Sequence, residues 1–344
     1  MKRIVRVRQE GRKTKLHLVD IRSLVSLHYL PDYKNPCWKV PIQSPPIRCI
    51  PYFYLIGCAK CGTTNLWETI VKHPQVADTE KETGHWINRK RFQGKPFHWY
   101  LEFFKTAVTK VKTKVDSTGF HPLIIGDGNP SLIAFNDYWK LDPANARHLS
   151  EPTFTNANAL YRLNPQAKII AILRDPVKRL ISEYNYFNST KFKKSSEHFH
   201  SLVQHEIQEF KTCSMKQTLR HCVYIKHNES KFGRVWLGLY AVFLEDYYRV
   251  FPREQILVLS LETCSQDFAL CLQRTYDFLE VAPIDLETIR VWLNQSEIAN
   301  RGPSKVTMLD STRRIAEQFY EPYNADLLKL MGPDFNYTYT NEVS

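Results

Sequence analysis

Apolar residues occur along this chain in short continuous runs that alternate with longer segments of mixed polarity. The short runs are rich in Ile, Leu, Val and Tyr and end at glycine or charged residues, which is typical of buried β-strands. In the longer segments apolar residues recur every three or four positions, the spacing of one helix face. Strands separated by helices predict an α/β fold with a mainly parallel central sheet flanked by helices. The predicted strands are 52–57, 123–127, 168–173 and 255–261, and the predicted helices are 63–72, 97–110, 176–188, 197–212, 234–250, 266–280 and 311–331.

Neither a repeat nor a low-complexity tract divides the 344 residues. We therefore expect one domain at 35–335, which is long enough to bury a sizeable core. Residues 1–34 are expected to form a basic lead-in without firm structure, and 336–344 a C-terminal tail. Ligands bind at the carboxyl ends of strands in such sheets, so the residues that follow each predicted strand are the first site candidates.

The loop after the first predicted strand has the composition of an anion site. Gly57 to Thr64 reads GCAKCGTT and leads into an amphipathic helix, whose N–H groups and dipole attract phosphate. Lys60 adds a positive charge, and Thr63 and Thr64 add hydroxyl donors. A nucleoside-triphosphate loop carries lysine directly after its second glycine, whereas Thr63 follows Gly62 here. The alternative is an ordinary tight turn between a strand and a helix.

A second anion motif follows the predicted strand 168–173. Arg174 and Asp175 end this strand, and Pro176 stands in the first turn of the next helix, where proline is tolerated. Ser182 lies about two helical turns further on. The guanidinium of Arg174 and the hydroxyl of Ser182 are suited to hold one phosphate together. Alternatively, Arg174 and Asp175 form a local ion pair and Ser182 is an incidental helix residue.

The two loops resemble those with which the sulfotransferases bind 3′-phosphoadenylyl sulfate (PAPS). The resemblance assigns Arg174 and Ser182 to the 3′-phosphate, and it assigns the phosphosulfate to Lys60, Cys61, Gly62, Thr63 and Thr64. Further blocks are similar to the Golgi carbohydrate sulfotransferases, and closest to the N-acetylgalactosamine 4-sulfate 6-O-sulfotransferases. These blocks are NPCW (35–38), RCIPYFYLIG (48–57), KCGTT (60–64), RKRF (89–92), LRDPVKRLISEYNYF (173–187) and GLYAVFLEDY (238–247).

This resemblance implies an activity and a compartment. The expected reaction transfers a sulfuryl group from PAPS to a glycosaminoglycan hydroxyl, the 6-hydroxyl of N-acetylgalactosamine 4-sulfate in chondroitin sulfate, without an obligatory metal. Family members are type II membrane proteins of the Golgi lumen. Residues 1–19 are basic and contain no apolar run long enough for an anchor, so the chain is either truncated or reaches its compartment another way.

The acceptor hydroxyl needs a base, because its pKa lies far above 7. The segment 79–86 follows the loop helix and should return beside the anion site. Carbohydrate members of the family carry a Lys-Glu pair here, followed by a histidine, and Lys81 and Glu82 match that pair with Glu82 as the base. His85 matches the histidine with a shift of one residue, and Lys81, His85 and Arg89 are expected to contact the acceptor. The alternative is a solvated run of charges.

Three residues of the C-terminal half are further nucleotide candidates. The segment 300–305, NRGPSK, resembles a basic loop that closes over the nucleotide, with Arg301 and Lys305 directed to the 3′-phosphate. The alternative is that Arg301 and Lys305 are ordinary charged side chains of a surface loop. Tyr240 is expected to line the nucleotide pocket, although an aromatic residue at helical spacing is more often part of the core.

The net charge of the chain indicates what kind of molecule it binds. The sequence has 47 Lys and Arg against 35 Asp and Glu, a net charge of +12, which favours a polyanionic partner. Nucleic acid is disfavoured, because no known binding module, zinc-ligand spacing or RNA-stacking motif is present. A sulfated glycosaminoglycan fits both the charge and the family.

Cysteines and sequons favour the secretory pathway. Cys213 and Cys222 are expected to form the disulfide of this family, with Cys37 and Cys49 as a second pair. The C-x-x-C formed by Cys58 and Cys61 lies inside the phosphate loop and is interpreted as loop packing. Four N-glycosylation sequons begin at Asn188, Asn228, Asn294 and Asn336.

Two rival functions remain at this point. A P-loop kinase of small molecules is one, since LIIGD at 123–127 could serve as the second acidic strand of such enzymes. The position of Lys60 argues against it. A catalytically silent glycan-binding protein of the same fold is the other, and the family deviation at Thr83 and Gly84 keeps this alternative open.

Overall fold

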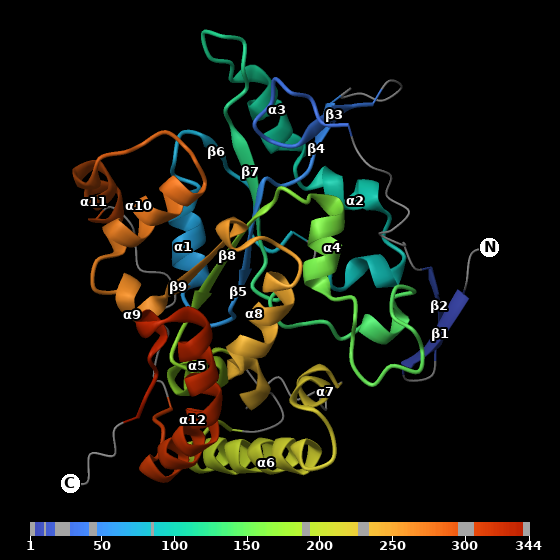
Figure 1. Ribbon diagram of the computed structural model, residues 1–344, viewed down its shortest axis with the longest axis vertical. Coiled ribbons are helices and arrows are strands. Elements are labelled where there is room, and N and C mark those ends of the chain that lie inside the picture. The colour runs from blue at the N-terminus through green and yellow to red at the C-terminus, as the bar shows by residue number, and fades with distance from the viewer. Residues whose placement is uncertain are drawn as a thin grey trace.

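The computed structural model describes residues 4–9, 12–17, 28–40, 47–83, 86–187, 193–225, 234–294 and 306–339. At its centre lies a five-stranded sheet in which all neighbouring strands are parallel (Figure 1). The predicted α/β fold with a parallel sheet is therefore confirmed. In spatial order the strands are β6 (Val76–Ala77), β7 (Ile124–Gly128), β5 (Phe53–Gly57), β8 (Lys168–Leu173) and β9 (Ile256–Ser260).

Burial explains why the strands could be read from the sequence. Every residue of β5, β7 and β9 is buried, as expected for a parallel sheet that is covered on both faces. Such strands appear in the sequence as continuous apolar runs. The strand β6 was not predicted, because its two residues are too few to show any period.

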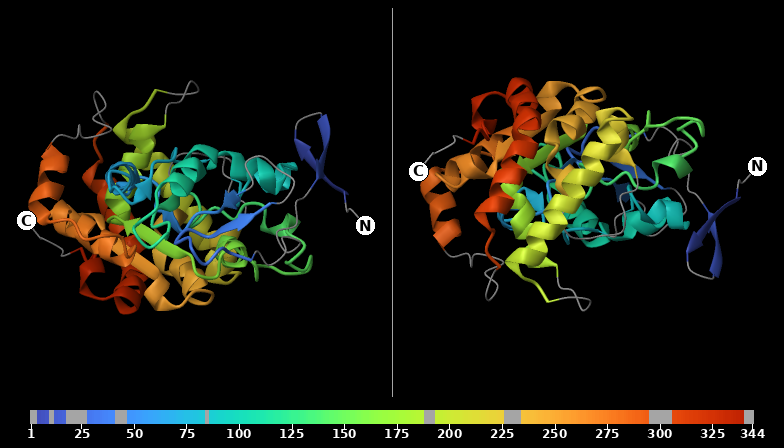
Figure 2. Two further views of the ribbon diagram at one scale, coloured as in Figure 1. Left: turned by 90° about the horizontal axis from the view of Figure 1, so that it is seen from above. Right: turned by 90° about the horizontal axis from the view of Figure 1, so that it is seen from below.

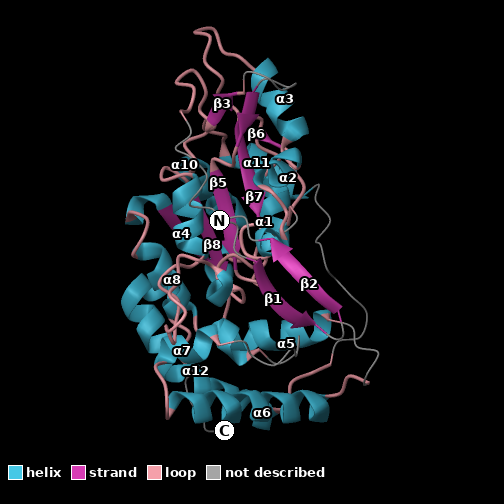
Figure 3. Cartoon of the chain, turned by 90° about the vertical axis from the view of Figure 1, so that its right-hand side faces the viewer, coloured by secondary structure: helices cyan, strands magenta, loops and turns pink. Residues whose placement is uncertain are grey.

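Helices cover both faces of the sheet. They are α1 (Thr63–Ile70), α2 (Phe97–Glu102), α3 (Lys105–Thr113), α4 (Asn156–Leu163), α5 (Pro176–Tyr186), α6 (Ser196–Ser214), α7 (Leu219–Tyr224), α8 (Tyr240–Tyr248), α9 (Leu261–Cys264), α10 (Phe268–Phe278), α11 (Leu286–Asn294) and α12 (Asp310–Met331). On one side α10 packs between α1 and α11, while α12 packs against α5, α6 and α8 (Figures 1 and 3). The single helix predicted at 97–110 is divided into α2 and α3.

Two small antiparallel pairs precede the central sheet. Strands β1 (Ile4–Gln9) and β2 (Arg12–His17) form a hairpin at one end of the molecule, where the sequence suggested no element (Figure 2). Strands β3 (Cys37–Lys39) and β4 (Ile47–Cys49) pair beside α3, and a disulfide joins Cys37 to Cys49, a pair that the sequence suggested without deciding it. Within the described residues no helix is both long and apolar enough to span a membrane.

The order of the strands places three helix starts at one edge of the sheet. The strand β5 leads into α1, β8 into α5, and β9 into α9. Since β5, β8 and β9 are parallel neighbours, their carboxyl ends and the following loops lie side by side. This edge therefore contains both anion motifs predicted from the sequence.

Candidate active site

The end of β5 and the start of α1 each have one position that accommodates only a glycine without rearrangement. Gly62 is the N-cap of α1 and has φ +85°, and a Cβ there would lie 2.8 Å from Cδ1 of Leu261. A Cβ on Gly57 would lie 2.4 Å from Cγ2 of Ile133. The close packing and the left-handed backbone fix the start of α1, and the first N–H groups of a helix have no partner within it, so that a helix start of this kind can bind an anion.

Lys60 lies in this loop with its ammonium group over an aromatic ring. Its Nζ is 3.4 Å from the centre of the Tyr186 ring, a cation–π contact with the last residue of α5. Burial lowers the pKa of Lys60 to about 8, the carboxylate of Glu183 opposes this shift, and the charges of Lys81 and Arg174 add to it. The lysine is thus close to two other cations, which favours the binding of an anion between them.

The segment that follows β6 returns to the loop, as predicted. Nζ of Lys81 donates hydrogen bonds to the hydroxyls of Thr63 at 3.3 Å and Thr64 at 3.1 Å. The same ammonium lies 3.3 Å from the carboxylate of Glu82, whose side chain is 45% exposed. The backbone N–H of Glu82 donates to the carbonyl oxygen of Gly128 at the end of β7, at 2.7 Å. A lysine and a solvent-accessible carboxylate therefore border the loop.

The second loop is tied to the first by side chains. Nη1 of Arg174 donates to the carbonyl oxygen of Lys60 at 3.3 Å. The hydroxyl of Tyr240 donates to the carbonyl oxygen of Arg174 at 2.8 Å and lies 3.8 Å from Sγ of Cys61. Tyr240 is 1% exposed, so the structure places it between the loops, in the core, rather than on an open pocket wall. Ser182 lies half-buried on α5, two turns beyond Arg174.

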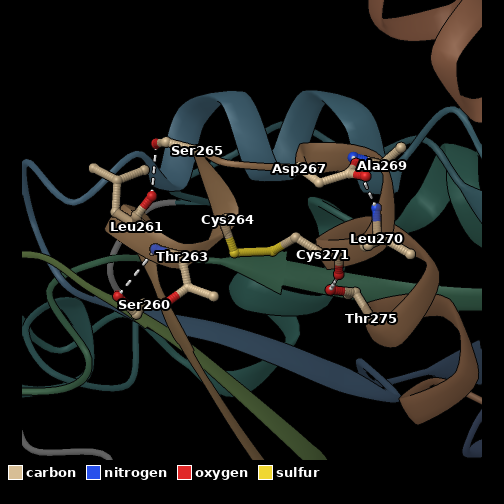
Figure 4. The surroundings of a disulfide bond; sticks show 10 residues. All are labelled: Ser260, Leu261, Thr263, Cys264, Ser265, Asp267, Ala269, Leu270, Cys271 and Thr275. Atoms are coloured by element: carbon tan, nitrogen blue, oxygen red, sulfur yellow. Dashed lines mark hydrogen bonds between the residues drawn. A yellow bond between two sulfur atoms is a disulfide. The ribbon is translucent and has the colours of Figure 1, made fainter. Parts of the chain in front are cut away.

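The start of α9 supports both loops. The backbone N–H of Asp175 donates to Oε1 of Glu262 at 3.2 Å, while Leu261 packs on Gly62. A disulfide between Cys264 and Cys271 joins α9 to α10 just beyond this contact (Figure 4). The sequence left the pairing of these two cysteines open.

A buried ionic cluster lies on α5, below the loops. Arg179 and Glu183 are both fully buried and pair at 3.2 Å, one helical turn apart. Arg234 forms a second ion pair with Glu183, and its carbonyl oxygen accepts a hydrogen bond from Nη2 of Arg179 at 2.8 Å. Sequence reasoning missed this cluster, although the i, i+4 spacing of an arginine and a glutamate was a visible signal.

Some of the remaining predicted residues are described by the structure, and others lie outside the described ranges. Arg89 is exposed, and within the described residues no hydrogen bond or ion pair joins it to the loops. Asn294 and Asn336 are exposed, as sequons require. A disulfide joins Cys213 to Cys222, as predicted, while Cys58 and Cys61 are free, buried thiols in the loop. His85, Asn188, Asn228, Arg301 and Lys305 lie outside the described residues.

Comparison with known proteins gives a consistent result. Carbohydrate sulfotransferase 15 of Mus musculus is 33% identical over 309 residues, which cover 84% of this chain and 54% of that protein. This chain therefore spans about half the length of the carbohydrate sulfotransferase 15 proteins that it matches. Heparan sulfate glucosamine 3-O-sulfotransferase 3B1 of Homo sapiens is 23% identical over 333 residues, covering 89% of this chain and 72% of that protein.

The fold comparison and the family model agree with these relatives. The crystal structure of a sulfotransferase from Alicyclobacillus acidocaldarius matches with a TM-score of 0.52 at 20% identity, covering 82% of this chain and 96% of the other. That likeness establishes a shared fold. Residues 51–313 match the family model described as the sulfotransferase domain, and these residues include β5, β8 and both anion loops. The chain therefore belongs to the sulfotransferase family.

Proposed function

We propose that this chain transfers a sulfuryl group from PAPS to a hydroxyl of a sulfated glycosaminoglycan. The acceptor in this proposal is the 6-hydroxyl of N-acetylgalactosamine 4-sulfate in chondroitin sulfate. The observation that carries the proposal is the convergence of three cations on the loop after β5. Lys60 and Arg174 follow the neighbouring strands β5 and β8, and Lys81, which follows β6, contacts the hydroxyls of Thr63 and Thr64. The net charge of +12 and the carbohydrate sulfotransferases among the relatives support a polyanionic glycan acceptor.

The two loops fit the two charged ends of PAPS. The N–H groups at the start of α1, with Lys60 and the two threonine hydroxyls, bind the phosphosulfate in this proposal. Arg174 and Ser182 bind the 3′-phosphate. Bound PAPS supplies an activated sulfuryl group. Lys60 and Lys81 stabilise the negative charge that develops on the phosphosulfate oxygens, and such preorganised charge contributes on the order of 10²–10³ in rate.

Glu82 is the base in this proposal. Its carboxylate is accessible to solvent and lies beside the ammonium of Lys81, which itself contacts the loop. It therefore accepts the acceptor proton close to where the sulfuryl group is held. His85 is the second candidate for this role.

The disulfide bonds of the chain support its placement in an oxidising compartment. Disulfides join Cys37 to Cys49, Cys213 to Cys222 and Cys264 to Cys271, which is unusual for a reducing cytosol. We place the protein in the Golgi lumen, in association with the membrane, on the basis of these bonds and its relatives.

The decisive experiment incubates the protein with labelled PAPS and a panel of chondroitin, dermatan and heparan sulfates. Transfer to the 6-position of chondroitin 4-sulfate supports the proposal, and transfer to another glycan alone overturns the acceptor. Glu82→Gln should lower turnover at least ~100-fold while the affinity for adenosine 3′,5′-bisphosphate stays unchanged. Glu80→Gln is the matched control, because Glu80 is exposed in the same segment. If Glu82→Gln keeps more than about a tenth of turnover, the base lies elsewhere.

Thermal melting distinguishes the first rival function, and the transfer assay distinguishes the second. A kinase would be stabilised against heat by ATP with Mg²⁺ and not by adenosine 3′,5′-bisphosphate. A silent glycan-binding protein would retain chondroitin sulfate but transfer no label to any acceptor.

A further inference from the structure

Glu82 adopts a backbone conformation that is unfavourable for its residue type. Its φ is +63°, in the left-handed region, which is unfavourable for a residue with a Cβ. Such a conformation persists only where the surrounding contacts enforce it. The N–H of Glu82 is held by the carbonyl oxygen of Gly128 at 2.7 Å, and this is one such contact.

A second contact acts through the next residue. Thr83 is 3% exposed, and its hydroxyl donates to Oδ1 of Asp127 at 3.0 Å. Asp127 is 2% exposed, and its Oδ2 accepts a hydrogen bond from the hydroxyl of Tyr100 at 2.7 Å. Asp127 and Gly128 are consecutive residues at the end of β7, so one strand end holds both Glu82 and Thr83.

This strand end is itself fixed against the phosphate-loop helix. A Cβ on Gly128 would lie 2.6 Å from the ring of Trp67, a residue of α1. Glycine therefore allows β7 to approach α1 closely. Because α1 begins in the phosphate loop, the contacts of Thr83 set the position of Glu82 relative to that loop.

We propose that Thr83 and Asp127 are positioning residues for the base of the transfer reaction, and that full turnover requires Asp127 to be ionised. The inference rests on the proposed function of Glu82. In the family's carbohydrate members a single residue separates the Lys-Glu pair from the histidine, whereas Thr83 and Gly84 stand there in this chain. The positioning role of Thr83 provides a physical reason for that difference.

Ionisation of Asp127 falls within an accessible pH range. Burial raises the pKa of Asp127 to about 6, the hydrogen bonds from Tyr100 and Thr83 lower it, and the charge of Glu82 raises it. Tyr54 of β5 also faces this carboxylate. Above about pH 6 the carboxylate is charged and accepts strongly from Thr83, whereas below it the protonated group accepts weakly. Turnover should therefore rise as the pH increases through about 6.

The test compares Thr83→Val with Thr79→Val. Thr79 is a matched control, because its buried hydroxyl donates to the carbonyl oxygen of Gly126 at 3.1 Å and leaves Asp127 untouched. We expect Thr83→Val to lower kcat about tenfold with an unchanged affinity for adenosine 3′,5′-bisphosphate. The acidic limb near pH 6 should disappear from its pH profile, because ionisation of Asp127 can no longer act on a residue 83 that lacks the hydroxyl. Thr83→Ser should restore both, and Thr79→Val should alter neither.

A second measurement separates this inference from the proposed function. Hydrogen exchange of the Glu82 amide, which needs no substrate, should be faster in Thr83→Val than in Thr79→Val. If exchange and the acidic limb both remain as in the wild type, the positioning role is refuted, even if sulfuryl transfer is established. If exchange accelerates while the wild type transfers no sulfate to any glycan, the positioning of Glu82 holds and the proposed reaction is refuted.

Discussion

Lys60 should lose its positive charge near pH 8, and we therefore expect the affinity for the nucleotide to decrease as the pH rises above that value. Burial in the loop lowers the pKa of this lysine to about 8, and the neighbouring charges of Lys81 and Arg174 contribute to the shift. An anionic ligand binds the ammonium form and not the neutral amine. The affinity for an anionic nucleotide is therefore close to its maximum below about pH 7, and it falls as the pH rises through about 8.

The magnitude follows from the fraction of protein that is competent to bind. The apparent Kd equals the intrinsic Kd divided by the protonated fraction of Lys60. With a pKa of about 8, that fraction falls from about 0.9 at pH 7 to about 0.03 at pH 9.5. The apparent Kd for adenosine 3′,5′-bisphosphate should thus rise about thirtyfold over this interval, or about 2 kcal/mol.

Isothermal titration calorimetry at a series of pH values measures this change directly. Lys60→Arg is the matched control, because the guanidinium stays charged over the whole range. The wild-type affinity should fall above pH 8, while that of Lys60→Arg should stay within about threefold. Parallel pH profiles for the two proteins would show that Lys60 does not contact the bound phosphates.

Three further predictions concern stability. Gly62→Ala places a Cβ on a residue with a left-handed backbone, so it should lower both the melting temperature and the nucleotide affinity. Urea unfolding should show a loss of about 1–2 kcal/mol in the free energy of unfolding, and an unchanged melting temperature would contradict this. Replacing Cys264 and Cys271 together by Ser should lower the free energy of unfolding by ~2–3 kcal/mol on the chain-entropy model, and urea titration without reductant measures it. Glu183→Gln leaves the buried guanidinium of Arg179 without its carboxylate, so we expect a loss of about 3–5 kcal/mol in the same assay. A loss below about 1 kcal/mol would mean that water or another group compensates the charge.

The sequence by itself determined the features whose signals are local. Strands β5 and β8 could be predicted because a buried parallel strand is a continuous apolar run. The two anion loops could be predicted because each combines a strand end, a cation and a helix start within a few residues. The disulfide between Cys213 and Cys222 followed from the family resemblance, and the short distance along the chain is consistent with it.

The tertiary structure decided which distant groups meet at these loops. Lys81 reaches the hydroxyls of Thr63 and Thr64, Tyr186 lies under the ammonium of Lys60, and Asp127 receives the hydroxyl of Thr83. These contacts depend on β7 lying between β6 and β5, with β8 on the other side of β5. Hydrophobic periodicity reports whether a residue is buried, but not which strand becomes its neighbour after a helical crossover. Partners of the charged side chains are therefore set by the order of strands in the sheet.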